Sequence, residues 1–129
     1  MSNITHDMMG EHRAKIPFPD VAAGGASNYI AMWVAPYKCK YKVNIWFTDA
    51  VSGNTTNRFN LNLKDDAQTS EVANKDFSTG VDGAVGTAIA LLSTNTNINA
   101  DEAIYLQREL VSGGLATPFG IMEVVYYGM

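Results

Sequence analysis

The chain has 129 residues, of which 47% are hydrophobic and 17% charged, and its formal net charge is −4 with a pI near 4.9. This length accommodates one domain with its own hydrophobic core. An acidic chain lacks the extended basic surface that binds phosphates, so we expect no nucleic acid partner.

A single cysteine, Cys39, rules out an intrachain disulfide and a thiolate metal cluster. No apolar run approaches the roughly 20 residues of a membrane-spanning helix. The first residues also lack the apolar segment of a secretory signal. We therefore expect a protein that is made in the cytoplasm and has no membrane partner.

Residues 1–18 are predicted to form an extended N-terminal arm, which precedes one β domain over residues 19–129. The first 13 residues lack periodicity. Pro17 and Pro19 exclude the following segment from a central strand but allow an edge strand or an entry segment. Two interpretations of the arm stay open, a flexible terminus and a segment that becomes ordered on a partner.

Four side chains of the arm belong to types that bind metal ions: His6, Asp7, Glu11 and His12. No predicted rigid element holds them at ligand geometry. The acid pair Asp65 and Asp66 lacks the spacing of a calcium-binding loop. We therefore predict no metal and no other cofactor.

The next predicted strand, residues 29–35, is apolar on both faces. This pattern is typical of a strand with one face on the core and the other against a neighbouring subunit or a loop. Pro36 ends the strand.

Residues 37–64 are predicted to form a long β-hairpin. Apolar residues occupy every second position of its first strand and share one face: Cys39, Tyr41, Val43, Ile45 and Phe47. The opposite, wet face carries Lys38, Lys40, Lys42 and Asn44, and Trp46 interrupts it. In the second strand, Phe59, Leu61 and Leu63 alternate with Arg58, Asn60, Asn62 and Lys64. Because a hairpin cannot bury its dry face alone, the rest of the chain must supply an opposing layer.

The second half of the chain alternates predicted strands with turns. Residues 65–76 are predicted to form a loop, and the glycine-rich residues 77–92 a bulged strand. A polar connection follows over residues 93–100. Two further strands are predicted over residues 101–110 and 119–127, and the latter is apolar on both faces, as in a central strand or a subunit contact.

These segments give seven or eight strands at a spacing of roughly 10 to 15 residues, with no predicted helix, which is the pattern of an antiparallel β-sandwich. We therefore predict an all-β fold with an extended N-terminal arm.

An enzyme would need an activated nucleophile or a titratable pair on rigid elements. Both histidines fall in the arm, Cys39 lies on the dry face, and most carboxylates fall in loops. We therefore predict no enzymatic activity, with an enzyme that uses the acidic loops as the alternative. The remaining candidate surface consists of side chains that we expect to be exposed: Trp33, Trp46, Tyr105, Met122, Tyr126 and Tyr127. A symmetric oligomer such as a trimer would cover them.

Three segments resemble the small head proteins of tailed bacteriophages. Residues 46–61 resemble the hairpin of that family, in which a turn such as Gly53-Asn54-Thr55-Thr56 leads into the next strand. Residues 98–106 resemble the approach to the penultimate strand, with Asp101-Glu102 where Gly-Asp is commoner in the family. Residues 113–126 resemble the closing strand.

The resemblance implies a capsid decoration (cement) protein with a single jelly-roll fold and no catalytic residues. Such a protein binds the exterior of the assembled capsid, commonly as a trimer, and its N-terminal arm often contacts the shell. The implied partners are the major capsid protein and further copies of the chain. The implied location is the capsid exterior of the virion, after synthesis in the host cytoplasm.

The alternative is a fibre, tail or baseplate module of the same fold that binds host-surface glycans. In this alternative, Trp46 and the Asn-rich loops bind the glycan. The candidate partner contacts are seven side chains: Ile16, Phe18, Lys38, Lys40, Trp46, Tyr126 and Tyr127.

Overall fold

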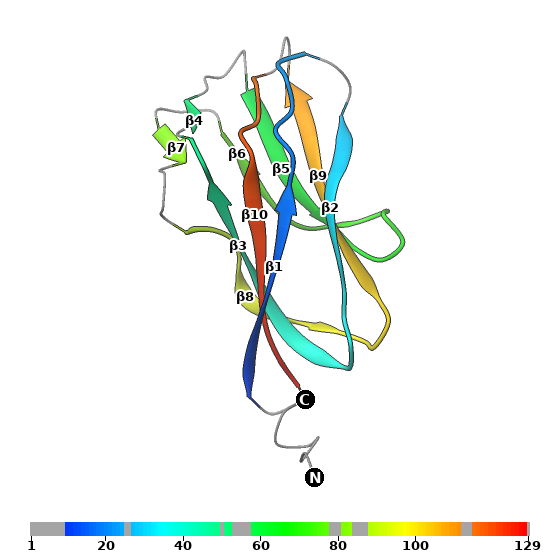
Figure 1. The fold of residues 1–129 in the computed structure, drawn as a ribbon. Coiled ribbons are helices and arrows are strands. Elements are labelled where there is room, and N and C mark those ends of the chain that lie inside the picture. The colour runs from blue at the N-terminus through cyan, green and yellow to red at the C-terminus, as the bar shows by residue number, and fades with distance from the viewer. Residues whose placement is uncertain are drawn as a thin grey trace.

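Eight strands form two four-stranded antiparallel sheets that pack face to face (Figure 1). The first sheet has the order β1 (Glu11–Phe18), β10 (Gly120–Gly128), β3 (Cys39–Phe47), β8 (Ile89–Ile98). The second sheet has the order β2 (Asn28–Val34), β9 (Ala103–Val111), β5 (Arg58–Lys64), β6 (Glu71–Asp76). Two short strands, β4 (Val51–Ser52) and β7 (Val81–Gly83), pair separately.

This computed structural model describes residues 10–24, 27–49, 51–52, 58–77, 81–83, 88–111 and 115–128, and none of these is helical. The predicted all-β antiparallel sandwich is therefore confirmed.

The strand pairs are nested within one another. β1 pairs with β10, β2 with β9, β3 with β8, and β5 with β6. Of these four pairs, only β5–β6 joins strands that follow one another in the sequence, so the chain behaves as one long antiparallel ribbon that folds over onto itself. Two further pairs, β10–β3 and β5–β9, close each half of the ribbon into a sheet.

The prediction that residues 37–64 form a hairpin is wrong, because its two strands do not pair with each other. The side chains predicted to face the core do so. β3 and β5 lie in different sheets, and their inner faces meet across the core, where the rings of Phe47 and Phe59 lie 6.1 Å apart. Alternation fixes which side chains turn inward but not which strand is the neighbour. The predicted dry face is buried in full: Cys39, Tyr41, Val43, Ile45 and Phe47.

The predicted wet face of the second hairpin strand is wrong at its centre, because Asn60 and Asn62 are buried. Each is covered on the outer face of the second sheet by a partner on β9. The Asn60 Nδ2 donates to Glu109 at 3.2 Å, and the Asn62 Nδ2 donates to Gln107 at 3.2 Å.

Residues 11–18, predicted as part of an extended arm, form an edge strand instead. β1 is in register with β10 from Glu11, opposite Tyr127, to Phe18, opposite Gly120. Phe18 is fully buried. The prolines allow this edge position. The charged residues Glu11, Arg13 and Lys15, which protect the edge, make the segment look like a solvated terminus in the sequence. The rest of the predicted arm, residues 1–9, lies outside the described residues.

Two strands occupy segments whose polar residues predict loops. β6 lies within the predicted loop over residues 65–76, and β8 continues from Ile89 to Ile98, through the predicted polar connection. Both are edge strands, in which one side of the strand meets solvent, so polar residues such as Ser93 and Thr94 are exposed without interrupting the strand.

A cluster of aromatic rings joins the two sheets at one end of the core. The rings of Phe59 and Phe77 stack at 4.8 Å, and Phe47 meets both edge-on. Phe18 packs edge-on against Phe47 and covers Gly120, where an added Cβ would collide with the backbone carbonyl of Trp46 and with the Phe18 ring. A side chain larger than hydrogen therefore does not fit at position 120.

Arg108 is the largest fully buried side chain and points inward from β9. Its guanidinium donates to the Thr117 hydroxyl and to the carbonyls of Ala22, at 3.0 Å, and Leu115, at 2.9 Å. Desolvation lowers the pKa of this guanidinium, and no described carboxylate forms an ion pair with it. Arg108 therefore ties two connecting segments to the sheet through neutral acceptors.

Two buried groups of β3 make the stability of the fold depend on pH in the alkaline range. Burial raises the pKa of the Cys39 thiol from 9.0 to about 11. Burial, followed by the charges of Cys39 and Asp65, raises the pKa of Tyr41 from 10.0 to about 12. Because both values are higher in the folded state, the resulting stabilisation is complete below pH 9 and is lost as the pH rises to about 12.

We therefore expect the free energy of unfolding, measured by urea denaturation, to fall between pH 9 and about 12. In Tyr41→Phe the fall above pH 10 should be shallower, because one of the two titrating groups is absent. Equal slopes in the wild type and the variant would contradict this assignment.

The position of Phe18 gives a second prediction. Phe18→Ala should lower the free energy of unfolding by about 3–5 kcal/mol, because it leaves a cavity between the sheets. The matched control is Phe119→Ala, since Phe119 is 44% exposed, and its cost should stay within about 0.5 kcal/mol. Equal costs for the two variants would show that residues 11–18 do not form part of the sheet.

Candidate functional site

Three of the seven predicted contact residues lie on the outer face of the first sheet. Lys40 is opposite Tyr127, and Trp46 is opposite Ile121. The lysine and tryptophan side chains of β3 therefore point away from the core, as predicted. A fourth predicted contact, Lys38, is exposed in the bend that precedes β3.

The other three predicted contact residues point into the molecule. Phe18 is buried, and Ile16 and Tyr126 pack against the core. The Tyr126 ring lies 5.0 Å from Trp33 and stacks on His12 at 5.4 Å. These residues help to hold β1 and β10 to the core. Phe18 is fully buried there, whereas Ile16 and Tyr126 are only partly buried.

Two further side chains that were predicted to be exposed are buried, Trp33 and Met122. Both are on strands that are apolar on both faces, and in such strands the sequence pattern does not identify the inner face.

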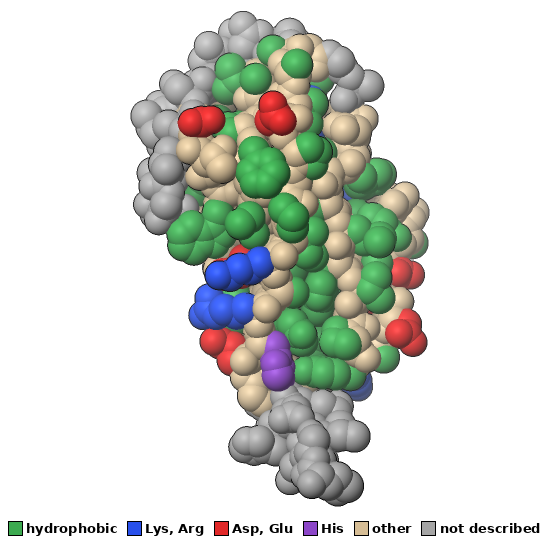
Figure 2. Space-filling model, viewed as in Figure 1, with side chains coloured by type: hydrophobic (Ala, Val, Ile, Leu, Met, Phe, Trp, Pro, Cys, Tyr) green, Lys and Arg blue, Asp and Glu red, His purple; other side chains and the backbone are tan. Residues whose placement is uncertain are grey.

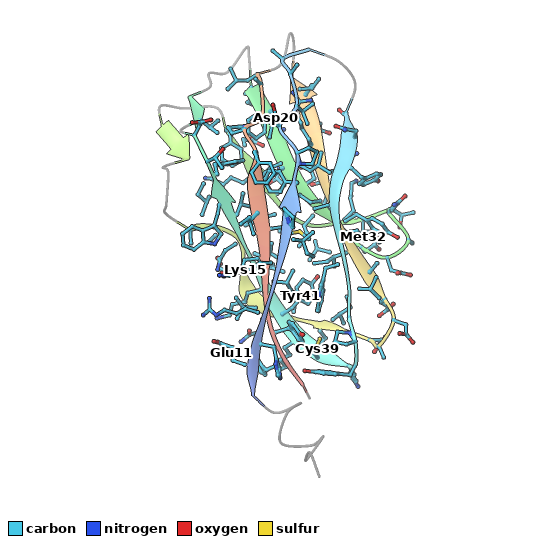
Figure 3. The ribbon with its side chains drawn as sticks, in the orientation of Figure 1. Glu11, Lys15, Asp20, Met32, Cys39 and Tyr41 are labelled. Carbon is cyan, nitrogen blue, oxygen red and sulfur yellow. The ribbon has the colours of Figure 1, made fainter. Side chains whose placement is uncertain are left out.

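The centre of the first sheet's outer face carries a buried carboxylate. Glu123 is 2% exposed. Its Oε1 accepts hydrogen bonds from Arg13, at 3.3 Å, and from Asn44, at 3.2 Å, and Lys15 is its neighbour on β1. The cationic side chains of β1 thus lie beside Glu123. Together these charged side chains cover the middle of the outer face of the first sheet. Lys15 and Glu11 both project from β1 in Figure 3.

Trp46 lies at one end of this face beside a cavity of about 210 Å³. Lys15 and Ile121 line the same cavity. The indole Nε1 of Trp46 is buried and has no hydrogen-bond partner among the described residues. An apolar ring beside a lysine can stack on an apolar group of a partner.

Three of the four large apolar side chains that are exposed in the described chain lie on β2, and the fourth is Phe119. Tyr29, Met32 and Val34 are 41%, 50% and 44% exposed, and we refer to these three residues as the β2 stripe. Hydrophobic side chains are visible over β2 in Figure 2, and Met32 projects from this strand in Figure 3. Tyr105 extends the stripe onto β9, with its ring 5.6 Å from Tyr29.

β2 is also an edge strand that carries no charged residue. The edge strand β1, by contrast, carries Glu11, Arg13 and Lys15 on its outer face. Charged residues on an edge strand prevent association with other chains, so β2 is less protected than β1. The edge strand β8 also lacks charged residues, but it exposes polar residues and not large apolar ones. The signal for this edge is present in the sequence, in the strand that is apolar on both faces, but the predicted contacts include none of the three stripe residues.

The described residues contain no cluster of three or more His, Cys, Asp or Glu side chains placed to hold a metal ion. His12 is in β1 and not in an arm, while His6 and Asp7 lie outside the described part of the chain. Cys39 is buried with a raised pKa, which disfavours the reactive thiolate. In the described ranges, no helix is long and apolar enough to cross a membrane.

Comparison of the chain with protein-family models, with curated proteins and with solved structures finds no match in any of the three.

Proposed function

We propose that this chain is a non-enzymatic virion structural protein that binds the exterior of an assembled phage capsid and stabilises it. In this proposal it acts as a decoration (cement) protein in the form of a homotrimer, and its partners are the major capsid protein and its own copies. The observation that carries the proposal is the strand order, taken together with the resemblance of three sequence segments to phage head proteins.

The strand order supports assignment of the sandwich as a single jelly roll. A jelly roll is an eight-stranded double sheet made of two Greek keys, and it is a common fold of viral capsid proteins. The nested pairs β1–β10, β2–β9, β3–β8 and β5–β6 are those expected when one antiparallel ribbon is rolled into two sheets. Because folds are shared between functions, this order supports the architecture and not the partner.

The β2 stripe supports association with other chains. Contiguous exposed apolar residues on an uncharged edge strand are costly in an isolated protein and are covered in an oligomer or at an interface. A ligand that binds only the assembled capsid stabilises it by mass action, and many symmetric copies add avidity to a weak single contact.

The capsid proposal is tested by adding the purified protein to capsids of the same virus that lack it. We expect co-sedimentation and a higher capsid melting temperature, because binding stabilises only the assembled lattice. A capsid that neither binds the protein nor changes its melting temperature would refute the proposal.

The oligomer proposal is tested by native mass measurement of Met32→Glu. A charge placed in the β2 stripe should shift the protein from trimer to monomer, because an unpaired charge in an apolar contact is strongly unfavourable. The matched control is Ser93→Glu, which adds the same charge at an exposed position of β8. A trimer that persists in Met32→Glu, or a wild type that is monomeric, would overturn this assignment.

The cavity beside Trp46 favours a second candidate function, a fibre, tail or baseplate module that binds host glycans. Aromatic rings stack on sugar rings, and Lys15 supplies a hydrogen-bond donor at the same cavity. Binding on a glycan array that is abolished in Trp46→Ala would favour this function over capsid decoration.

A further inference from the structure

The outer face of the first sheet is basic, although the chain as a whole is acidic. Of the nine Lys and Arg side chains of the chain, five lie on this face or in the bend that leads into β3: Arg13, Lys15, Lys38, Lys40 and Lys42. Of the acidic side chains that the structure describes, this face has two, Glu11 and Glu123. Lys and Arg side chains lie next to one another over this sheet in Figure 2. More than half of the positive charge of the molecule is therefore on one side of it.

The cations form two columns that flank the inner strand β10. Arg13 on β1 and Lys42 on β3 are both in register with Val125 of β10. Lys40 is in register with Tyr127. Because neighbouring strands are about 4.8 Å apart, the two columns are roughly 10 Å apart, and the half-buried Val125 and Tyr127 lie between them. The face thus has a more apolar centre and charged borders, as contact surfaces between proteins have.

The two carboxylates of this face leave its lysines unpaired. Glu123 is 2% exposed, and its Oε1 accepts hydrogen bonds from Arg13 and Asn44. Glu11 also pairs with Arg13, at 3.3 Å. In the part of the chain that the structure describes, no ion pair involves the lysines of this face or of the adjacent bend: Lys15, Lys38, Lys40 and Lys42.

Edge protection does not account for the lysines of β3. Cations on an edge strand prevent association with other chains, and Arg13 and Lys15 on β1 can have this role. β3 is an inner strand, with β10 on one side and β8 on the other, so Lys40 and Lys42 have no free edge to protect. These like charges on one face repel each other, and an anionic partner would offset this repulsion.

We propose that this face binds an acidic segment of a partner protein. The carboxylates of such a segment would pair with the free lysines, and its apolar side chains would cover the centre of the face. A nucleic acid is the less suitable partner, because its phosphates extend beyond the face to the rest of the molecule, where negative charge is in excess. This inference goes beyond the proposed function, since it assigns the chemistry of a contact and does not depend on the partner being a capsid protein.

The test is an NMR titration of the ¹⁵N-labelled full chain at low salt with hexaglutamate that is acetylated at its N-terminus and amidated at its C-terminus. We expect saturable shifts of amides in residues 40–46 of β3 and 121–127 of β10, and little change in β5 and β9 of the other sheet. Hexaglutamine, which has the same length and no charge, should cause no shifts. High salt should weaken the binding, because 1 M salt reduces the Debye length to about 3 Å.

Charge reversal tests whether the lysines of this face are responsible. Lys42→Glu should weaken hexaglutamate binding about fivefold or more, the effect of losing one exposed ion pair and adding a repulsion. The matched control is Lys64→Glu, which makes the same change at a half-buried position on the outer face of the second sheet, and it should alter the affinity much less. Lys42→Gln removes the charge without adding a carboxylate. It provides a second variant if Lys42→Glu does not fold, and it should also weaken binding more than Lys64→Glu.

Four outcomes would overturn the inference: no saturable binding of hexaglutamate, equal binding of hexaglutamine, equal losses of affinity in Lys42→Glu and Lys64→Glu, or tighter binding of a single-stranded oligothymidylate of the same charge. The last outcome would identify the face as a nucleic acid contact. Failure to co-sediment with capsids would refute the proposed function and leave this inference standing, so the two are tested separately.

Discussion

The contact between the inner faces of β3 and β5 is the constraint on which the rest of the structure depends. Phe47 meets Phe59 and Phe77 across the gap between the sheets, and Phe18 closes the same cluster from β1. Since neither sheet has another apolar face large enough to form a core, the burial of these inner faces fixes how the sheets lie together. The outer faces are thereby left free to carry polar networks and the β2 stripe.

Strong alternation in the sequence predicts the faces of β3 and β5 correctly, because a period of two leaves one inner and one outer set of residues. The same alternation does not predict the strand partners, since pairing within a ribbon that folds over itself is decided by contacts between distant segments. Edge strands are the least predictable elements. In β1 buried and exposed positions do alternate, but the first inner positions are His12 and Ala14, which give a weak apolar signal. β6 and the second half of β8 consist mostly of polar residues, so their sequences have the pattern of loops.

The candidate site is predictable only in part for a similar reason. Lys40 and Trp46 lie on an outer face because β3 alternates, whereas Tyr126 packs inward on a strand whose two faces are both apolar. The acid pair Asp65 and Asp66 is visible in the sequence, but its neighbours in space are not. Asp65 and Glu102 are far apart along the chain, and only the pairing of β5 with β9 brings them together beside Tyr41. The features that distinguish this chain chemically therefore arise from its topology.

The nested strand pairs also have a consequence for how the chain folds. β5–β6 is the one local hairpin among the four nested pairs, while β1 must find β10 at the other end of the described chain. Contacts that close long loops form slowly, so we expect this chain to fold slowly. The strand pairs should form from the middle of the chain outward, beginning with β5–β6 and ending with β1–β10. On the ribosome, the hairpin can form early, but β1 has no partner until β10 has emerged. During that interval the inner face of β1, including Phe18, stays exposed to chaperones and to other nascent chains.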